Sequence, residues 1–256
     1  MTAPRYLFSG IYLLERIGAL GQGKGYGAGA KKQEVKVLQQ LLGRTPQLAI
    51  DMGGNVGNYT AELRRRNPSL EIHTFEPSAT NIAKLNDRFK SDERVKLLPF
   101  AVSDSSGSAT LFSDRPGSNL SSLSKRRLDH FDISFETKET INTIRFEDYW
   151  KTTLGERPLD IVKIDIEGHE LAALNGFGSA IDATSVIQFE FGGCNIDTRT
   201  YFRDFWYFFH PRGFDLYRIT PFGAEKLRRY KESDEFFATT NYIAVNRAPG
   251  RSMPSP

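Results

Sequence analysis

Residues 159–170 read Leu-Asp-Ile-Val-Lys-Ile-Asp-Ile-Glu-Gly-His-Glu, and this stretch decides the fold. Its apolar run predicts a buried strand, and the strand ends in a polar cluster around Gly168. In open α/β sheets, ligands bind outside the carboxyl ends of the strands. We therefore expect Asp165, Glu167 and His169 to arrive together at the mouth of a site.

A second stretch, residues 48–60, reads Leu-Ala-Ile-Asp-Met-Gly-Gly-Asn-Val-Gly-Asn-Tyr-Thr. It predicts a strand that ends at Asp51, followed by a glycine-rich turn into a helix. Gly53 and Gly57 permit a tight turn that brings the backbone close to a ligand. Asn55 tolerates the left-handed backbone conformation that such a turn requires. This strand–turn–helix unit is typical of a nucleoside site.

The next predicted strand ends at Glu76, an acid about 20 residues beyond the turn, where a carboxylate accepts the ribose hydroxyls of a nucleoside. A dinucleotide fingerprint counted from Gly53 fails, because Asn55 and Asn58 occupy the glycine positions. Asp51, placed before the turn, would repel a pyrophosphate but suits a cationic ligand. S-adenosylmethionine, with its ammonium, sulfonium and ribose, fits these acids better than NAD does.

Taken together, these motifs resemble the FkbM-type family of class I S-adenosylmethionine-dependent methyltransferases. The resemblance spans about residues 46 to 246. It implies a seven-stranded sheet whose last strand is antiparallel. It also implies O-methylation of sugars in polysaccharides, glycolipids or glycosylated natural products. The matching segments are Ile50-Asp-Met-Gly-Gly-Asn-Val-Gly-Asn-Tyr, Phe75-Glu-Pro, Ala101-Val-Ser-Asp and Val162-Lys-Ile-Asp-Ile-Glu-Gly-His-Glu.

The alternation of strand and helix patterns predicts an α/β, Rossmann-like, mostly parallel sheet with helices on both faces. The expected strands are 47–51, 71–76, 95–102, 159–166, 185–191, 214–219 and 236–245. The expected helices are 57–66, 78–90, 169–175 and 198–210. No helical pattern separates the last two strands, so we expect them to form a hairpin.

We expect three parts along the chain. Residues 1–45 form a helical region interrupted by a glycine-rich loop at 21–29, which serves as a connector or an active-site lid. Within it, the apolar stretch 7–20 is expected to pack on the domain as an amphipathic helix, with contact to a membrane surface as the alternative. Residues 46–246 form the methyltransferase domain, and residues 247–256 form a flexible tail.

Residues 103–147 are too long and polar for a simple connection, and long irregular loops in compact domains are often functional. We interpret them as an insertion on the acceptor side of the site. The segment Ser118–Ser124 offers hydroxyls to a polar acceptor such as a sugar. Lys125, Arg126 and Arg127 either meet a phosphate or an acidic sugar, or form a solvated basic turn.

Composition limits the kinds of binding partner and the setting that we expect for the protein. The net charge of +3 is too small to indicate nucleic acid, so we expect a small-molecule or glycan acceptor. A single cysteine, Cys194, excludes an internal disulfide and fits the cytoplasm, where we expect it to be a passive small residue. No run of ~18 apolar residues occurs, so stable membrane insertion is not expected. The sequence leaves the oligomeric state undetermined.

A hydroxyl acceptor is a poor nucleophile at neutral pH, so a general base is needed. His169 is the natural candidate, with Asp165 or Glu167 orienting it or acting in its place. Glu190 ends the next strand and is expected to face the same cleft. Asp165, Glu167 and Glu190 offer the oxygens that magnesium prefers. No ligand spacing demands a metal, however, and we predict none.

Some alternatives stay open. Asp104 either accepts a hydrogen bond from the adenine amino group or caps the turn that follows it. The enzyme could instead be an RNA or protein methyltransferase, but the low net charge argues against this, as does Asp165-Ile-Glu-Gly in place of an Asn/Asp-Pro-Pro-Tyr segment. A non-catalytic cofactor-binding module is disfavoured because the glycine-rich turn and the acidic cluster are both intact.

Overall fold

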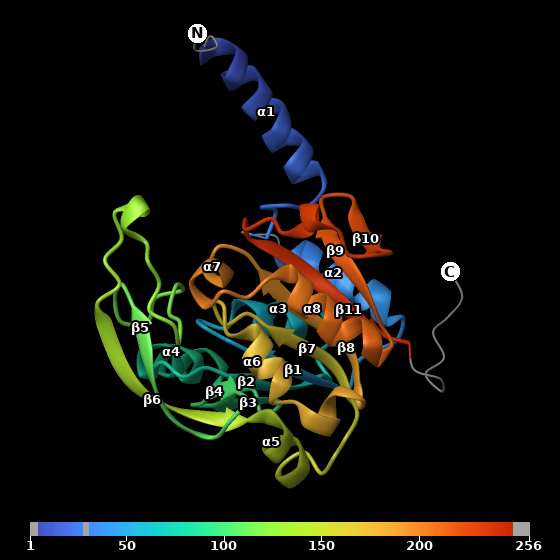
Figure 1. The fold of residues 1–256 in the computed structure, drawn as a ribbon. Helices are drawn as coiled ribbons and strands as arrows, with labels where there is room; N and C mark the ends of the chain where they lie inside the picture. Colours follow the sequence, from blue (N-terminus) through green and yellow to red (C-terminus); the bar gives the residue numbers. More distant parts are fainter. Residues whose placement is uncertain (1–4, 28–30, 248–256) are drawn as a thin grey trace.

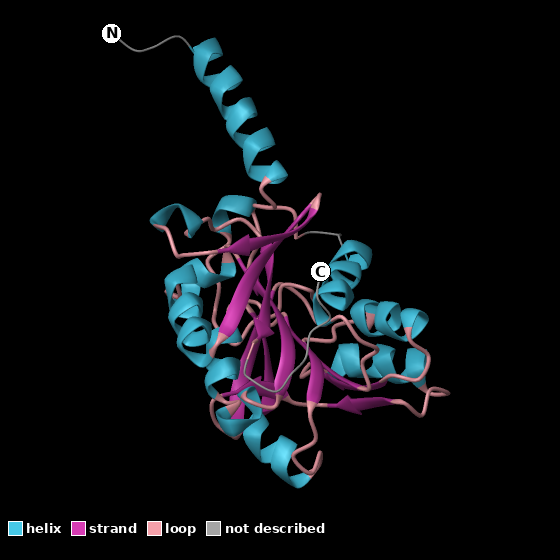
Figure 2. Ribbon diagram, turned by 90° about the vertical axis from the view of Figure 1, so that its right-hand side faces the viewer, coloured by secondary structure: helices cyan, strands magenta, loops and turns pink. Residues whose placement is uncertain are grey.

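Two sheets organise the chain, one of eight strands and one of three (Figures 1 and 2). The computed structural model describes residues 5–27 and 31–247. The strands are β1 (Leu48–Met52), β2 (Glu71–Phe75), β3 (Val95–Leu98), β4 (Ala101–Ser103), β5 (Gly107–Ser113), β6 (Thr137–Arg145), β7 (Leu159–Ile164), β8 (Thr184–Phe191), β9 (Phe214–Thr220), β10 (Gly223–Leu227) and β11 (Thr240–Asn246). The helices are α1 (Arg5–Gly21), α2 (Lys31–Leu42), α3 (Asn58–Arg66), α4 (Ala79–Phe89), α5 (Phe146–Thr152), α6 (Glu170–Asn175), α7 (Cys194–Thr198) and α8 (Phe202–Phe209). Short 3-10 turns are η1 (Asp129–Phe131), η2 (Gly178–Ile181), η3 (His210–Arg212) and η4 (Glu232–Asp234).

The large sheet has the strand order β10-β9-β11-β8-β7-β1-β2-β3. Its half from β8 to β3 is parallel, with Ile50 of β1 opposite Val162 of β7 and His73 of β2. β9, β10 and β11 are antiparallel to their neighbours, and β11 lies between β8 and β9. The predicted fold class and the antiparallel last strand are confirmed.

Helices cover both faces of this sheet because its strands are apolar on both sides. All five residues of β1 and all six of β7 are buried. On one face, α2 and α3 pack against alternate strand residues such as Ala49 and Ile161. On the other face, α5, α6 and α8 pack against Ile50, Val162 and their neighbours. A sheet enclosed in this way leaves its strand ends as the place where polar groups meet.

The strand count differs from the prediction. The large sheet has eight strands rather than seven, because β10 forms a hairpin with β9 that carries no strong apolar signal. The predicted strand 95–102 is two strands, since Pro99 and Phe100 separate β3 from β4 and β4 pairs with β6 in the second sheet. Proline has no backbone N–H to donate to a ladder, which explains the break. The predicted helix 198–210 is likewise divided into α7 and α8.

Residues 103–147 were predicted to be irregular, and this was wrong for two parts of the segment. β5 and β6 form an antiparallel pair, with Ala109 opposite Ile141, and β4 joins the other side of β6. Between them the chain runs back, and Ser122 bridges to Phe112. Figure 1 shows this sheet (green) extending beside the large one. Residues 103–147 therefore form an arm that is ordered by strand pairing, and not an irregular loop.

The N-terminal helix does not pack on the domain. α1 projects away from the body in both views (Figures 1 and 2). Its large apolar side chains are exposed. The expectation that the stretch 7–20 packs on the domain was wrong. α2, in contrast, buries Val35 and Leu38 against the sheet. The predicted tail lies outside the described residues except for Arg247, and residues 28–30 of the glycine-rich region lie outside them as well.

Candidate active site

A cavity of about 890 Å³ opens at the carboxyl ends of β1, β2, β7 and β8. This is the position at which open α/β sheets bind ligands. Its wall includes the turn after β1, the end of β2, the loop after β7 and part of the 103–147 segment. The predicted site residues in the wall are Gly53, Asn55, Glu76, Asp165, Glu167 and His169. Asp51, Gly57 and Asp104 lie outside this lining.

The turn after β1 is shaped by close packing. Gly53 has φ +85, and a Cβ there would collide with the Asp165 carbonyl oxygen. Gly57 has φ +79, and a Cβ there would lie 2.5 Å from Phe89 Cε2. Asn55 also adopts a left-handed conformation, with φ 49. The two glycines thus press the turn against β7 and α4, and the backbone of residues 53–56 faces the cavity.

Glu76 joins the end of β2 to this turn. Its Oε2 accepts a hydrogen bond from the Asn55 N–H at 2.8 Å, and its Oε1 accepts one from the Ser78 N–H at 3.0 Å. The residue is 6% exposed, and burial raises the pKa of its carboxyl. The Asn81 side chain donates a further hydrogen bond to this carboxyl, and a carboxylate with three donors still has acceptor capacity for a donor from the cavity.

Asp51 lies behind the cavity, at the second-last position of β1. It is fully buried, and its Oδ2 accepts a hydrogen bond from Thr60 Oγ1 at 2.6 Å, which ties β1 to α3. Burial raises the pKa of Asp51, and the nearby Lys163 ammonium opposes that effect. Its Oδ1 has no hydrogen-bond partner among the described residues. Asp51 therefore acts on the cavity through the structure of the turn and through its charge.

Asp165 forms an ion pair with Lys163. Lys163 Nζ donates to Asp165 Oδ2 at 2.7 Å, and the same ammonium lies 4.9 Å from the centre of the Tyr59 ring. Burial lowers the pKa of Lys163, but the Asp165 and Asp51 carboxylates outweigh burial and the net shift is upward. Lys163 was not singled out from the sequence, although a lone lysine inside the apolar run Val162–Ile164 was a visible signal.

Glu167 connects the loop after β7 to the 103–147 arm. It has φ 55, and its Oε2 lies 2.6 Å from Arg126 Nη1. Ser122 Oγ donates to the Glu167 carbonyl oxygen at 2.8 Å. Arg126 Nε also lies 3.6 Å from Asp197 Oδ2. Burial and the Asp165 charge raise the pKa of Glu167 to about 8, so this carboxyl holds a proton more readily than an ordinary glutamate.

His169 stands at the start of α6, and its Nε2 lies 3.0 Å from Ser103 Oγ. Burial lowers the pKa of His169, and the Asp104 charge opposes this only in part. The imidazole is therefore neutral at pH 7 and can accept a proton. Asp104 itself is exposed and accepts hydrogen bonds from Ser103 Oγ and Ser105 Oγ at 3.2 and 3.0 Å. These contacts match the alternative in which Asp104 caps its turn.

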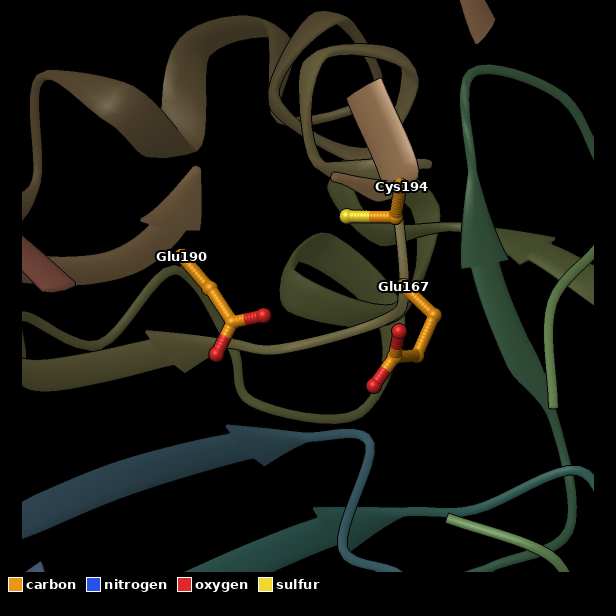
Figure 3. Close-up of side chains that lie close together, drawn as sticks. All are labelled: Glu167, Glu190 and Cys194. Atoms are coloured by element: carbon orange, nitrogen blue, oxygen red, sulfur yellow. The ribbon is translucent and has the colours of Figure 1, made fainter. Parts of the chain in front are cut away.

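Glu167, Glu190 and Cys194 form a cluster in the wall of the cavity (Figure 3). Their ligand atoms lie within 4.8 Å of one another, and Figure 3 shows all three side chains pointing into one space. Burial raises the pKa of Glu190, as do the Asp165 and Glu167 charges. Burial also raises the pKa of the Cys194 thiol, which keeps it protonated. Arg126 already pairs with Glu167, so this trio is a weak metal site as it stands. The possible magnesium ligands considered from the sequence were Asp165, Glu167 and Glu190. The cluster in the structure contains Cys194 in place of Asp165.

The N-terminal segment also reaches the cavity. Gly25, Gly27 and Lys31 are part of its wall, and the Gly27 N–H donates to the Thr239 carbonyl at 3.1 Å. The glycine-rich loop therefore lies over the site, as either a connector or a lid would. The sequence did not predict that this loop borders the cavity or that Gly27 contacts Thr239. The glycine pattern of residues 21–27 does not show which strand end the loop meets.

Comparison with known proteins provides independent evidence on the family of this chain. A model of the methyltransferase FkbM domain matches residues 51–216. The 2-O-methyltransferase NoeI of Sinorhizobium fredii is 22% identical over 202 residues, which cover 75% of this chain and 82% of that relative. Methyltransferase sdnD of Sordaria araneosa is 30% identical over 156 residues, which cover 50% of this chain and 59% of that relative. Among solved structures, the plantazolicin methyltransferase BamL, in complex with a triazolic desmethylPZN analog and SAH, has a TM-score of 0.50 at 11% identity over 86% of both chains, a likeness of fold alone.

Proposed function

Because this chain belongs to the FkbM methyltransferase family and is therefore an S-adenosylmethionine-dependent methyltransferase, we propose that it methylates a hydroxyl group on a sugar, glycolipid, polysaccharide or glycosylated natural product. One observation carries the proposal. A single cavity brings the glycine-rich turn and Glu76 together with His169 and the acids that follow β7. The name of NoeI, a 2-O-methyltransferase, supports oxygen as the methylated atom.

Gly53, Asn55 and Glu76 are our proposed cofactor contacts. The Glu76 carboxylate is held by two backbone N–H groups and borders the cavity, where it can accept a hydrogen bond from a ribose hydroxyl. Asp51 and Gly57 support the turn from behind. Asp104 is left out of this set, because it is exposed and points its carboxylate at its own serine neighbours.

His169 is our proposed general base. When bound, S-adenosylmethionine supplies an electrophilic methyl group, so the protein must position the acceptor oxygen and remove its proton. The neutral imidazole lies in the cavity wall and contacts Ser103, which orients the ring. Asp165 is paired with Lys163 and Glu167 with Arg126, so both are better suited to orientation than to proton removal.

We propose that residues 103–147 form the acceptor side of the cavity. Ser118–Ser122 and Arg126 contribute to the wall, and the arm is attached to the catalytic loop through Ser122 and Arg126. Since the Arg126 guanidinium is already in contact with Glu167 and Asp197, the wall offers few free cations. An uncharged polyol such as a sugar is therefore a better match than a nucleic acid. The lone buried thiol of Cys194 supports a cytoplasmic setting.

The test uses methyl-labelled S-adenosylmethionine. The protein is incubated with a lysate from cells that lack its gene, and the lysate is then separated into glycan and glycolipid, protein and RNA. We expect label in the glycan or glycolipid fraction, with a Glu76→Gln protein as the matched inactive control. Label in RNA or protein instead would overturn the proposed acceptor. Cofactor binding without any labelled fraction would argue against catalysis of this class.

A further inference from the structure

α1 is an apolar helix that is not covered by the rest of the chain. It contains 17 residues and projects from the body in both views (Figures 1 and 2). Leu14 is 71% exposed, an unusual value for a leucine in a folded protein. Its other exposed large apolar residues are Phe8, Ile11, Tyr12, Leu13, Ile17 and Leu20. Gly10 and Gly18 also lower its intrinsic stability in water. A helix of this kind is stable only when something covers it.

The large aliphatic residues of α1 occupy a broad arc, and its aromatic residues Phe8 and Tyr12 lie outside that arc. Successive residues of an α-helix are turned by about 100°, so Leu20, Leu13, Ile17, Leu14 and Ile11 span about half of the circumference. That half contains no charged residue, while Arg16 and Glu15 lie on the other half. A coiled-coil partner would need only a narrow seam, and one sustained over about three to four heptads. Seventeen residues are fewer than three heptads, so a second copy of this chain is a poor match.

The base of α1 adds another exposed apolar residue and positive charge. Gly23 packs against the carbonyl group of Ile219, which places the β9–β10 turn beside the helix, and Phe222 in that turn is 87% exposed. Lys24 Nζ donates to the Ser233 carbonyl in η4 at 2.9 Å, which brings η4 and the loop before it, residues 228–231, to the same place.

That loop is basic on its surface. Arg228, Arg229 and Lys231 are exposed, and Glu232 is the acid exposed beside them. The other acid of the segment 228–234, Asp234, is buried and paired with Arg218. Basic side chains next to an apolar helix complement the negative surface of a membrane that contains anionic lipids.

We propose that α1 binds the surface of an anionic lipid bilayer, with its uncharged half in the interface and the basic loop at the headgroups. This is surface attachment and not insertion. No helix within residues 5–27 and 31–247 has the length and apolar character needed to cross a bilayer. Broad apolar arcs flanked by arginine and lysine are typical of helices that lie in the plane of the interface.

Vesicle co-sedimentation of the full chain tests the proposal. We expect the protein to sediment with vesicles of phosphatidylcholine mixed with phosphatidylglycerol, less with phosphatidylcholine alone, and less again at high salt. Leu14→Glu and Ile17→Glu should each lower the bound fraction at least about tenfold, because each places a charge in the apolar arc. Tyr207→Glu is the matched control, since Tyr207 is 63% exposed on α8, and it should bind as wild type does.

Four results would overturn the proposal. One is failure of the wild-type chain to bind the anionic vesicles. Another is equal binding to both kinds of vesicle, which would remove the role of charge. Equal binding by Leu14→Glu would remove the role of α1. A dimer in sedimentation velocity that Leu14→Glu converts to a monomer would show that a second copy covers the helix. Cofactor affinity measured in parallel shows that each variant is folded.

Discussion

Glu170→Gln is the most informative change for the electrostatics of the site. Glu170 is fully buried, and its Oε1 accepts hydrogen bonds from the Ile166 and Gly168 N–H groups at 3.0 and 3.1 Å. It therefore holds the loop that carries the acids after β7. Its Oε2 has no partner among the described residues. A glutamine keeps an oxygen for the two N–H groups but cannot ionise, so the variant isolates the effect of charge.

The magnitude follows from the pKa of Glu170, which burial raises from 4.5 to about 7. Between these values the unfolded chain loses the proton and the folded protein keeps it, so the free energy of unfolding falls as pH rises. Each pH unit in that window costs about 1.4 kcal/mol. From pH 5 to pH 8 the wild type thus loses about 2.5 kcal/mol through this group, and Glu170→Gln does not.

Urea unfolding at pH 5, 6, 7 and 8 measures this difference. Relative to wild type, Glu170→Gln should become more stable by about 2 to 3 kcal/mol between pH 5 and pH 8. Glu62→Gln is the control, because its arginine neighbours lower the pKa of Glu62 to about 2, and its difference from wild type should stay flat over this range. A flat difference for Glu170→Gln as well would refute the inference that burial holds this carboxyl protonated.

Three further predictions concern the cofactor, the chemistry and the glycine-rich turn. Glu76→Gln should weaken S-adenosylmethionine binding at least about tenfold in calorimetry, because a charged acceptor is lost. Glu71→Gln, at the other end of β2, should not weaken it, and unchanged affinity in Glu76→Gln would remove Glu76 from the site. His169→Gln should lower kcat about a hundredfold or more with cofactor affinity intact. The kcat of the wild type should fall with acid only below pH 6.5, since burial lowers the pKa of His169. A wild-type rate in His169→Gln would exclude His169 as the general base. Gly57→Ala should destabilise the fold by more than about 1 kcal/mol in urea, because φ is +79 and its Cβ would meet Phe89; an unchanged midpoint would show that the turn relaxes freely.

The site residues at the strand ends could be predicted from the sequence, because the apolar run of a strand and the polar residues that follow it are adjacent in the chain. The apolar runs of β1 and β7 predict buried parallel strands, and parallel strands bring their carboxyl ends to one edge. Asp165, Glu167 and His169 follow β7 directly, and all three line the cavity. Glu76 lines it for the same reason at the end of β2.

Other features were not predictable because they depend on distant contacts. Asp104 is exposed where the chain has left the large sheet after β3 and β4 pairs with β6 in the second sheet. The ion pair of Arg126 with Glu167 joins residues 41 positions apart, and sequence alone left Arg126 in a solvated turn or an anion site. The periodicity of α1 shows that its apolar residues cover a broad arc, but periodicity does not tell what covers that arc.

The place of β11 in the large sheet bears on how the chain is made. β11 follows β8, β9 and β10 along the chain, yet it lies between β8 and β9, and all seven of its residues are buried. Until residue 246 has left the ribosome, β8 and the β9–β10 hairpin each present an open, hydrogen-bonding edge. Open strand edges recruit other chains. Nascent chains stalled before Thr240 should therefore aggregate or call on chaperones, whereas the arrival of seven residues closes the sheet in one step.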